Sequence, residues 1–232
     1  MVIPVYDESD QEPGSRPWVT WLLFALNITA FLFLTLFPAE FVQLLAEHFG
    51  VVGTYIAQGT RPEGVTLLIP PQLTLVTYTF LHGSWVHLAA NMLFLWVFGD
   101  NIEAALGHLR FLLFYVACGA VGGLVHVFIN PSSDIPLIGA SGAVSGIVAG
   151  YLLLRPAARV TFLVIGILPV TTRAYWIVAL WLAWQITNLV VPMTDMNDTN
   201  VAYWSHIGGF AAGLVLTVLL KRSGVALPWW NR

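Results

Sequence analysis

Two side chains that could carry out nucleophilic chemistry lie in apolar parts of this 232-residue chain. Ser141 stands in "GASG", at the head of the apolar run 141–154, and His206 stands in "SHIGGFAAG", early in the apolar run 202–220. A serine hydroxyl becomes a nucleophile when a neighbouring base takes its proton, and histidine is a common base for this step. Either residue alone is readily explained as a structural hydrogen-bonding group. As a pair, they predict a nucleophile, Ser141, and its general base, His206.

A second pair of polar residues could stabilise a developing negative charge. His87 and Asn91, in "HLAANM", are four residues apart and therefore project from the same face of a helix. An imidazole and an amide can donate hydrogen bonds to an oxyanion, and the alternative is a plain hydrogen bond between helices. Asp100 and Glu103 lie at the far end of the same apolar segment. No acid is therefore expected beside the serine, and the prediction is a Ser–His dyad rather than a triad.

The composition shows which solvent surrounds these residues. Hydrophobic residues make up 58% of the chain and charged residues only 9%, whereas soluble domains carry about 25% charged residues. The bilayer must therefore be the main solvent. The formal net charge of −3 argues against a nucleic-acid partner. The single cysteine, Cys118, excludes an intramolecular disulfide and a cysteine-based metal site, and there is no HExxH motif. We expect no metal and no cofactor.

The hydropathy pattern predicts an all-α integral membrane protein built as a six-helix bundle. The expected spans are about 17–37, 87–106, 109–129, 141–154, 173–191 and 202–220. Residues 1–16 are interpreted as a short exposed tail, 17–221 as the helical domain and 222–232 as a second tail. Residues 38–84 contain charges and prolines that make them too broken to span, and 160–170 is short and ends in proline. We expect both segments to lie at the membrane interface.

The distribution of lysine and arginine predicts the orientation. Six spans place both termini on one side of the membrane. That side collects Arg16, Arg110, Arg155, Arg159, Arg173, Lys221, Arg222 and Arg232. The other side has only Arg61. Both termini are therefore expected in the cytoplasm, and the loops around 38–84, 130–140 and 192–201 are expected to face outward.

Glycines in two of the spans indicate how these helices pack. They recur at four-residue spacing as Gly142, Gly146 and Gly150 in one span and as Gly209 and Gly213 in the other. Such stripes let helix backbones approach closely in lipid. If the two stripes pack together, the serine and the histidine come to one seam. The fourth span covers only about 21 Å of roughly 30 Å of hydrocarbon, so its head should lie below the outer face, at the floor of a wet cavity.

With these motifs in this order, the chain resembles the rhomboid family of intramembrane serine proteases from about residue 17 to residue 221. "GASG" is similar to the family's GxSG motif and implies that Ser141 is the nucleophile, while "SHIGGFAAG" implies that His206 is the base. "HLAANM" is similar to its HxxxN motif, which implies an oxyanion site made by Asn91, His87 and the Ser141 backbone N–H. "GDNIEAALG" resembles the end of the family's second helix, where Glu103 and Gly107 are structural.

The sequence departs from the family pattern at one position near the nucleophile. Some members carry a tyrosine four residues after the nucleophile, stacked on the histidine, and here that residue is Ser145. It shares a helical face with the nucleophile and could form a local hydrogen bond or merely pack; we favour packing. Trp176, Trp181 and Trp184 are mostly expected as interfacial anchors, although they could line the lateral entrance that the family places between its second and fifth helices.

The resemblance implies hydrolysis of a peptide bond in or near the transmembrane segment of single-span proteins, close to the outer end of their helix. The expected location is the cytoplasmic (inner) membrane of a bacterium, with the site open to the outer face. Two alternatives belong to other classes. A non-catalytic rhomboid-like protein would bind transmembrane helices, but such proteins lose the serine or the histidine. A small-solute channel would fit a wet cavity, but the chain has no internal repeat and few charges within its spans.

Overall fold

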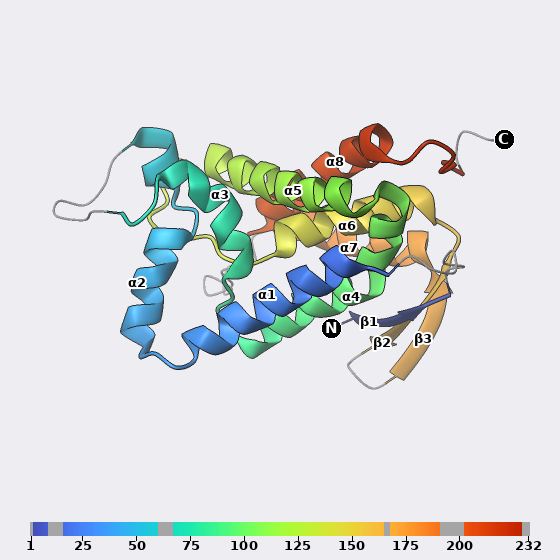
Figure 1. The fold of residues 1–232 in the computed structure, drawn as a ribbon, viewed down its shortest axis with the longest axis horizontal. Helices are drawn as coiled ribbons and strands as arrows, with labels where there is room; N and C mark the ends of the chain where they lie inside the picture. The colour runs from blue at the N-terminus through green and yellow to red at the C-terminus, as the bar shows by residue number, and fades with distance from the viewer. Residues whose placement is uncertain (1, 9–15, 60–66, 165–167, 191–201, 229–232) are drawn as a thin grey trace.

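The computed structural model describes residues 2–8, 16–59, 67–164, 168–190 and 202–228. Six long helices lie within a few residues of the six predicted apolar segments (Figure 1). They are α1 (Trp18–Leu34), α4 (Trp85–Leu106), α5 (His108–Ile129), α6 (Ser141–Leu154), α7 (Ala174–Val190) and α8 (Tyr203–Leu220). The long apolar runs in the sequence were therefore sufficient to predict where these helices begin and end to within a few residues.

Length and composition identify a smaller number of membrane spans within the described residues. The helices α5 and α8 are long and apolar enough to cross a membrane by themselves. The segment Pro71–Phe80 together with α4 passes the same test, but it bends by 85° at its break. The helices α1 and α6 are apolar but shorter. The number of spans beyond these stays a prediction.

The segment between α1 and α4 is folded into short pieces, as its prolines and charges predicted. It contains α2 (Ala39–Phe49), a π-helical turn, a 3-10 turn, α3 (Thr74–Thr77) and a second 3-10 turn. Val51 forms a β-bridge with Leu137, in the loop before α6. The segment therefore contacts the loop that leads to Ser141, which places it over the head of α6.

The glycine stripes of α6 and α8 lie against each other. A Cβ atom added at Gly209 would collide with the backbone carbonyl of Gly142, and one added at Gly213 would collide with the carbonyl of Gly146. At Gly150 an added Cβ would lie 2.7 Å from the Thr217 hydroxyl of α8. The two helices are thus in backbone contact, which only glycine permits in membrane-type packing.

A three-stranded antiparallel sheet corrects the expectation of a purely helical chain. Its strands are β1 (Val2–Asp7), β2 (Arg159–Val164) and β3 (Leu168–Arg173), in the order β1-β2-β3. Along β2, Val160 and Phe162 are buried and Thr161 between them is partly exposed. This period of two, in a run rich in β-branched residues, is a strand pattern. The sequence analysis assigned no strand to 160–170, and the interfacial location that it expected for this segment stays a prediction.

The first strand corrects the expectation of an exposed tail for residues 2–7; residue 1 and residues 9–15 of the expected tail lie outside the described residues. β1 pairs with β2, and the Asp7 carboxylate accepts hydrogen bonds from the Tyr151 hydroxyl at 2.8 Å and the Asn101 amide at 3.2 Å. Tyr151 belongs to α6 and Asn101 to α4. The sheet is therefore fastened to the end of the bundle that lies away from α2 (Figure 1).

Glu103 on α4 holds the beginning of α1. Its carboxylate accepts the backbone N–H groups of Val19 and Thr20, at 2.9 and 2.7 Å, and the Thr20 hydroxyl at 2.7 Å. It also contacts the ring Nδ1 of His108 at 2.5 Å. The first N–H groups of a helix lack acceptors within the helix, and here the buried carboxylate of Glu103 provides those acceptors. Gly107, with φ of +89°, makes the turn from α4 into α5.

Removing this carboxylate is expected to destabilise the helix bundle without changing any residue that lines the cavity around Ser141. Glu103→Gln turns one acceptor oxygen into an NH₂ group that faces donors. Buried donors without acceptors cost about 1–3 kcal/mol each, so we expect the free energy of unfolding in detergent to fall by roughly 2–4 kcal/mol. Thermal unfolding followed by circular dichroism measures the change. The exposed Glu40→Gln is the control, and equal midpoints for both variants would contradict the assignment.

Candidate active site

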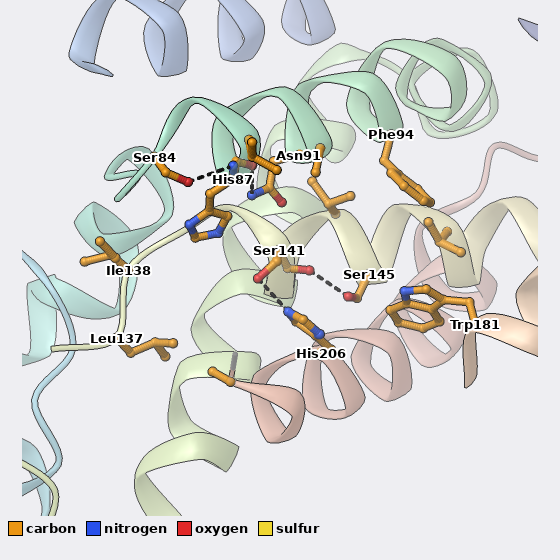
Figure 2. Close-up of a pocket in the computed structure, with 15 residues that line it drawn as sticks. Ser84, His87, Asn91, Phe94, Leu137, Ile138, Ser141, Ser145, Trp181 and His206 are labelled. Carbon is orange, nitrogen blue, oxygen red and sulfur yellow. Dashed lines mark hydrogen bonds between the residues drawn. The ribbon is translucent and has the colours of Figure 1, made fainter. Parts of the chain in front are cut away.

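The candidate nucleophile and base meet where α6 and α8 are in backbone contact. Ser141 is the first residue of α6, and His206 lies in the first turn of α8. The Oγ of Ser141 is 2.8 Å from the Nε2 of His206 (Figure 2). The close contact between Gly142 and Gly209 lies next to these side chains. The proximity inferred from the two glycine stripes is therefore present; the catalytic roles stay a prediction.

The loop that leads to the serine lies directly against His87. Gly139 has φ of +121°, a conformation that side chains rarely adopt, and an added Cβ would lie 2.5 Å from the Nε2 of His87. Any larger residue would therefore be strained and would displace the His87 ring. The first glycine of "GASG" allows this close approach of the loop to α4.

His87 and Asn91 occupy the first turns of α4 and line the same cavity as Ser141 and His206. The hydroxyl of Ser84 accepts the His87 backbone N–H at 3.1 Å and so caps this helix. The Asn91 Nδ2 donates to the His87 carbonyl at 3.1 Å. An NH₂ group carries two N–H bonds, so this contact uses one of them. Figure 2 shows both residues on the opposite side of Ser141 from His206.

The cavity around these groups has a volume of about 500 Å³. Figure 2 shows His87, Asn91 and His206 around Ser141, with the apolar side chains of Phe94 and Trp181 at the other end of the cavity. Of the three tryptophans considered from the sequence, only Trp181 lines it; Trp176 and Trp184 are more than half exposed. Such a site could hold an extended segment of apolar chain and present one of its carbonyl groups to the serine.

The structure adds a contact that the sequence analysis missed. The Oε1 of Gln185, on α7, lies 2.8 Å from the Nδ1 of His206. Gln185 is 4% exposed. A polar residue inside an apolar span was a visible signal, because buried amides in membranes find hydrogen-bond partners. Its partner could not be named from the sequence, because no local pattern shows which face of α7 packs against α8.

The hydroxyl of Ser145 forms a hydrogen bond where the sequence analysis favoured simple packing. This hydroxyl donates a hydrogen bond of 2.6 Å to the carbonyl of Ser141, one turn earlier in α6. The favoured interpretation, that it merely packs, is therefore wrong. Serines in apolar helices commonly satisfy their hydroxyl in this way. The residue lines the cavity but leaves the His206 ring to be held from elsewhere.

Two further histidines, His82 and His126, lie near the cavity that contains Ser141. His82, in the loop before α4, packs edge-on against His87 with ring centroids 5.1 Å apart. His126 lines a second cavity of about 500 Å³, which shares His87 with the first. Within the described residues, no group of three potential metal ligands occurs.

Comparison with known proteins identifies the family of this chain. The family model of the rhomboid domain matches residues 71–223, a range that contains Ser141, His206, His87 and Asn91. The chain belongs to the rhomboid family. Rhomboids are integral membrane proteins, and the family includes intramembrane serine proteases.

Several curated relatives resemble this rhomboid over different parts of their length. The rhomboid protease GluP of Bacillus subtilis is 34% identical over 65% of the chain and 27% of its own length. The chloroplastic rhomboid-like protein 11 of Arabidopsis thaliana is 32% identical over 48% of the chain and 38% of its own length. The putative rhomboid protease YdcA of Bacillus subtilis is 30% identical over 60% of the chain and 62% of its own length. The chain thus spans less than two thirds of each of these relatives.

Proposed function

We propose that this rhomboid is an intramembrane serine endopeptidase with a Ser141–His206 dyad. The observation that carries the proposal is the 2.8 Å contact between the Ser141 hydroxyl and His206 Nε2, inside a cavity that also holds His87 and Asn91. The family includes proteases of this kind. Non-catalytic rhomboid-like proteins are the alternative, and retention of both the serine and the histidine argues against it.

The proposed reaction has two halves. In the first, His206 Nε2 takes the hydroxyl proton while Ser141 Oγ attacks the carbonyl carbon of the substrate peptide bond. The bond to nitrogen then breaks, the imidazolium returns the proton to the leaving amine, and an acyl-serine remains. In the second half, His206 takes a proton from water, the hydroxide attacks the acyl carbon, and Ser141 Oγ leaves and recovers its proton. The released product carries a new carboxyl group.

The negative charge of each tetrahedral intermediate needs hydrogen-bond donors close to Ser141. The proposed donors are the second N–H of Asn91, the His87 ring and the backbone N–H of Ser141. That backbone N–H is at the N-terminus of α6, where helical N–H groups lack intrahelical acceptors. In soluble proteases, the loss of one such donor costs about 100- to 1000-fold in rate.

The proposed setting is a six-span protein of a bacterial cytoplasmic membrane, with both termini in the cytoplasm and the cavity open to the outer face. The cationic residues gathered on one side support this orientation. The sheet lies at the opposite end of the bundle from α2 (Figure 1), as expected if the sheet is cytoplasmic and the segment 38–84 is external. The proposed substrates are single-span membrane proteins, cut near the outer end of their helix.

The proposal is tested with wild-type protein reconstituted in liposomes together with a fluorescent single-span substrate. We expect cleavage within the outer part of the substrate helix, inhibition by a fluorophosphonate that labels serine nucleophiles, and no effect of EDTA. A protein that neither cleaves several substrates nor accepts the fluorophosphonate would instead support the helix-binding alternative. Passage of small solutes through the same liposomes would favour a channel.

A further inference from the structure

We propose that Gln185 is the positioning residue of the dyad and takes the place of the acid in a serine-protease triad. This inference rests on the proposed function of Ser141 and His206. It rests equally on a contact between α7 and α8, which is present whether or not the protein is active. The Gln185 Oε1 and the His206 Nδ1 are 2.8 Å apart, and the glutamine is buried.

The chemistry of the amide fixes the state of the imidazole. An amide oxygen can only accept a hydrogen bond, so the Nδ1 beside it must carry the ring proton. In a neutral imidazole, the Nε2 is then a bare acceptor. That Nε2 is the atom 2.8 Å from the Ser141 hydroxyl, which therefore donates to it. The chain of contacts from Ser141 through His206 to Gln185 holds the tautomer that a general base requires.

The arrangement is specific to one face of α7. Neighbours of Gln185 on this helix point outward, with Trp184 60% and Ile186 52% exposed, whereas Gln185 is only 4% exposed. The described residues that line the cavity include no aspartate or glutamate. Within the cavity, Ser145 is bonded to its own helix rather than to the imidazole. Gln185 is thus the side chain whose contact with Nδ1 holds the His206 ring.

A neutral amide orients the imidazole but offers no opposite charge to the imidazolium formed during the reaction. The loss of a correctly oriented tautomer costs about 10⁴-fold in a triad that contains a carboxylate. For an amide we expect a smaller loss, of roughly 10- to 100-fold. Because Gln185 does not touch the reacting atoms, this loss should fall on kcat and leave KM within about threefold.

The experiment compares three variants of the full-length protein in liposomes. Gln185→Met keeps the shape but removes the acceptor, and we expect kcat to fall by roughly 10- to 100-fold. Gln185→Glu restores an acceptor oxygen at the same place, and we expect kcat at or above about one third of the wild-type value. Asn188→Leu is the matched control, because the Asn188 amide bonds only to the Trp184 carbonyl of the same helix among the contacts described. Its kcat should equal that of the wild type.

A spectroscopic readout separates this inference from the proposed function. Nitrogen-15 spectra of histidine-labelled protein, with His206 assigned through His206→Ala, report which ring nitrogen carries the proton. We expect the Nδ1–H form in the wild type and in Gln185→Glu, and its loss in Gln185→Met. An inactive wild type with the Nδ1–H form would remove the proposed function and keep the positioning contact. An unchanged kcat and an unchanged tautomer in Gln185→Met would overturn the inference.

Discussion

Ser141→Ala is expected to abolish cleavage. Without the hydroxyl no acyl-enzyme forms, and the remaining donors can only orient water against the substrate. In soluble serine proteases, loss of the nucleophile costs about 10⁶-fold in kcat, so the rate in liposomes should fall below detection. Labelling by the fluorophosphonate should disappear with it. The measurement is substrate cleavage beside labelling, at equal amounts of protein.

The structure offers a matched control for this variant in the same helix. Ser145→Ala also removes one hydroxyl from the cavity, but that hydroxyl bonds only to the Ser141 carbonyl among the described contacts. Its rate should stay within several-fold of the wild type. His206→Ala should match Ser141→Ala, and the double variant should lose nothing further, because the two residues act as a unit. Residual cleavage in Ser141→Ala that a fluorophosphonate still blocks would identify a different nucleophile.

The sequence predicted the helices well because each is marked by a local signal. The long apolar runs place the ends of α4, α5 and α6 within a few residues of those in the structure. The meeting of Ser141 and His206 could be inferred as well, because glycines at matching four-residue spacing indicate which helix faces pack together.

The features that the sequence did not reveal depend on long-range arrangement. β1 pairs with β2 across more than 150 positions of the chain, and no pattern within residues 2–7 names that partner. Gln185 is one polar residue among several on α7, and only the packed structure shows that its amide meets the Nδ1 of His206. Ser145 was misjudged for a simpler reason. A serine inside a helix has the carbonyl four residues earlier within reach, and that bond was given too little weight.

Gly209→Ala is expected to have the second-largest effect, although this residue takes no part in the chemistry. The added methyl group would overlap the Gly142 carbonyl, and the three atoms nearest to it are all backbone atoms of Gly142. Side-chain rotation cannot relieve the overlap, so α6 and α8 must separate by on the order of 1 Å. Overpacking of this kind costs about 1–3 kcal/mol, and the midpoint of thermal unfolding should fall accordingly.

Separating α6 from α8 would also change the candidate site, because the Ser141–His206 contact crosses the same interface between these two helices. Ser141 adjoins Gly142, and His206 lies one turn before Gly209. Moving the helices apart by on the order of 1 Å would stretch the 2.8 Å contact beyond hydrogen-bond range. A displacement of this size can cost about 100-fold in rate, so we expect cleavage and fluorophosphonate labelling to fall together by at least that factor. Ala211→Val, on the exposed face of α8, is the control and should change neither. Wild-type labelling in folded Gly209→Ala would show that the glycine contact does not set the distance between nucleophile and base.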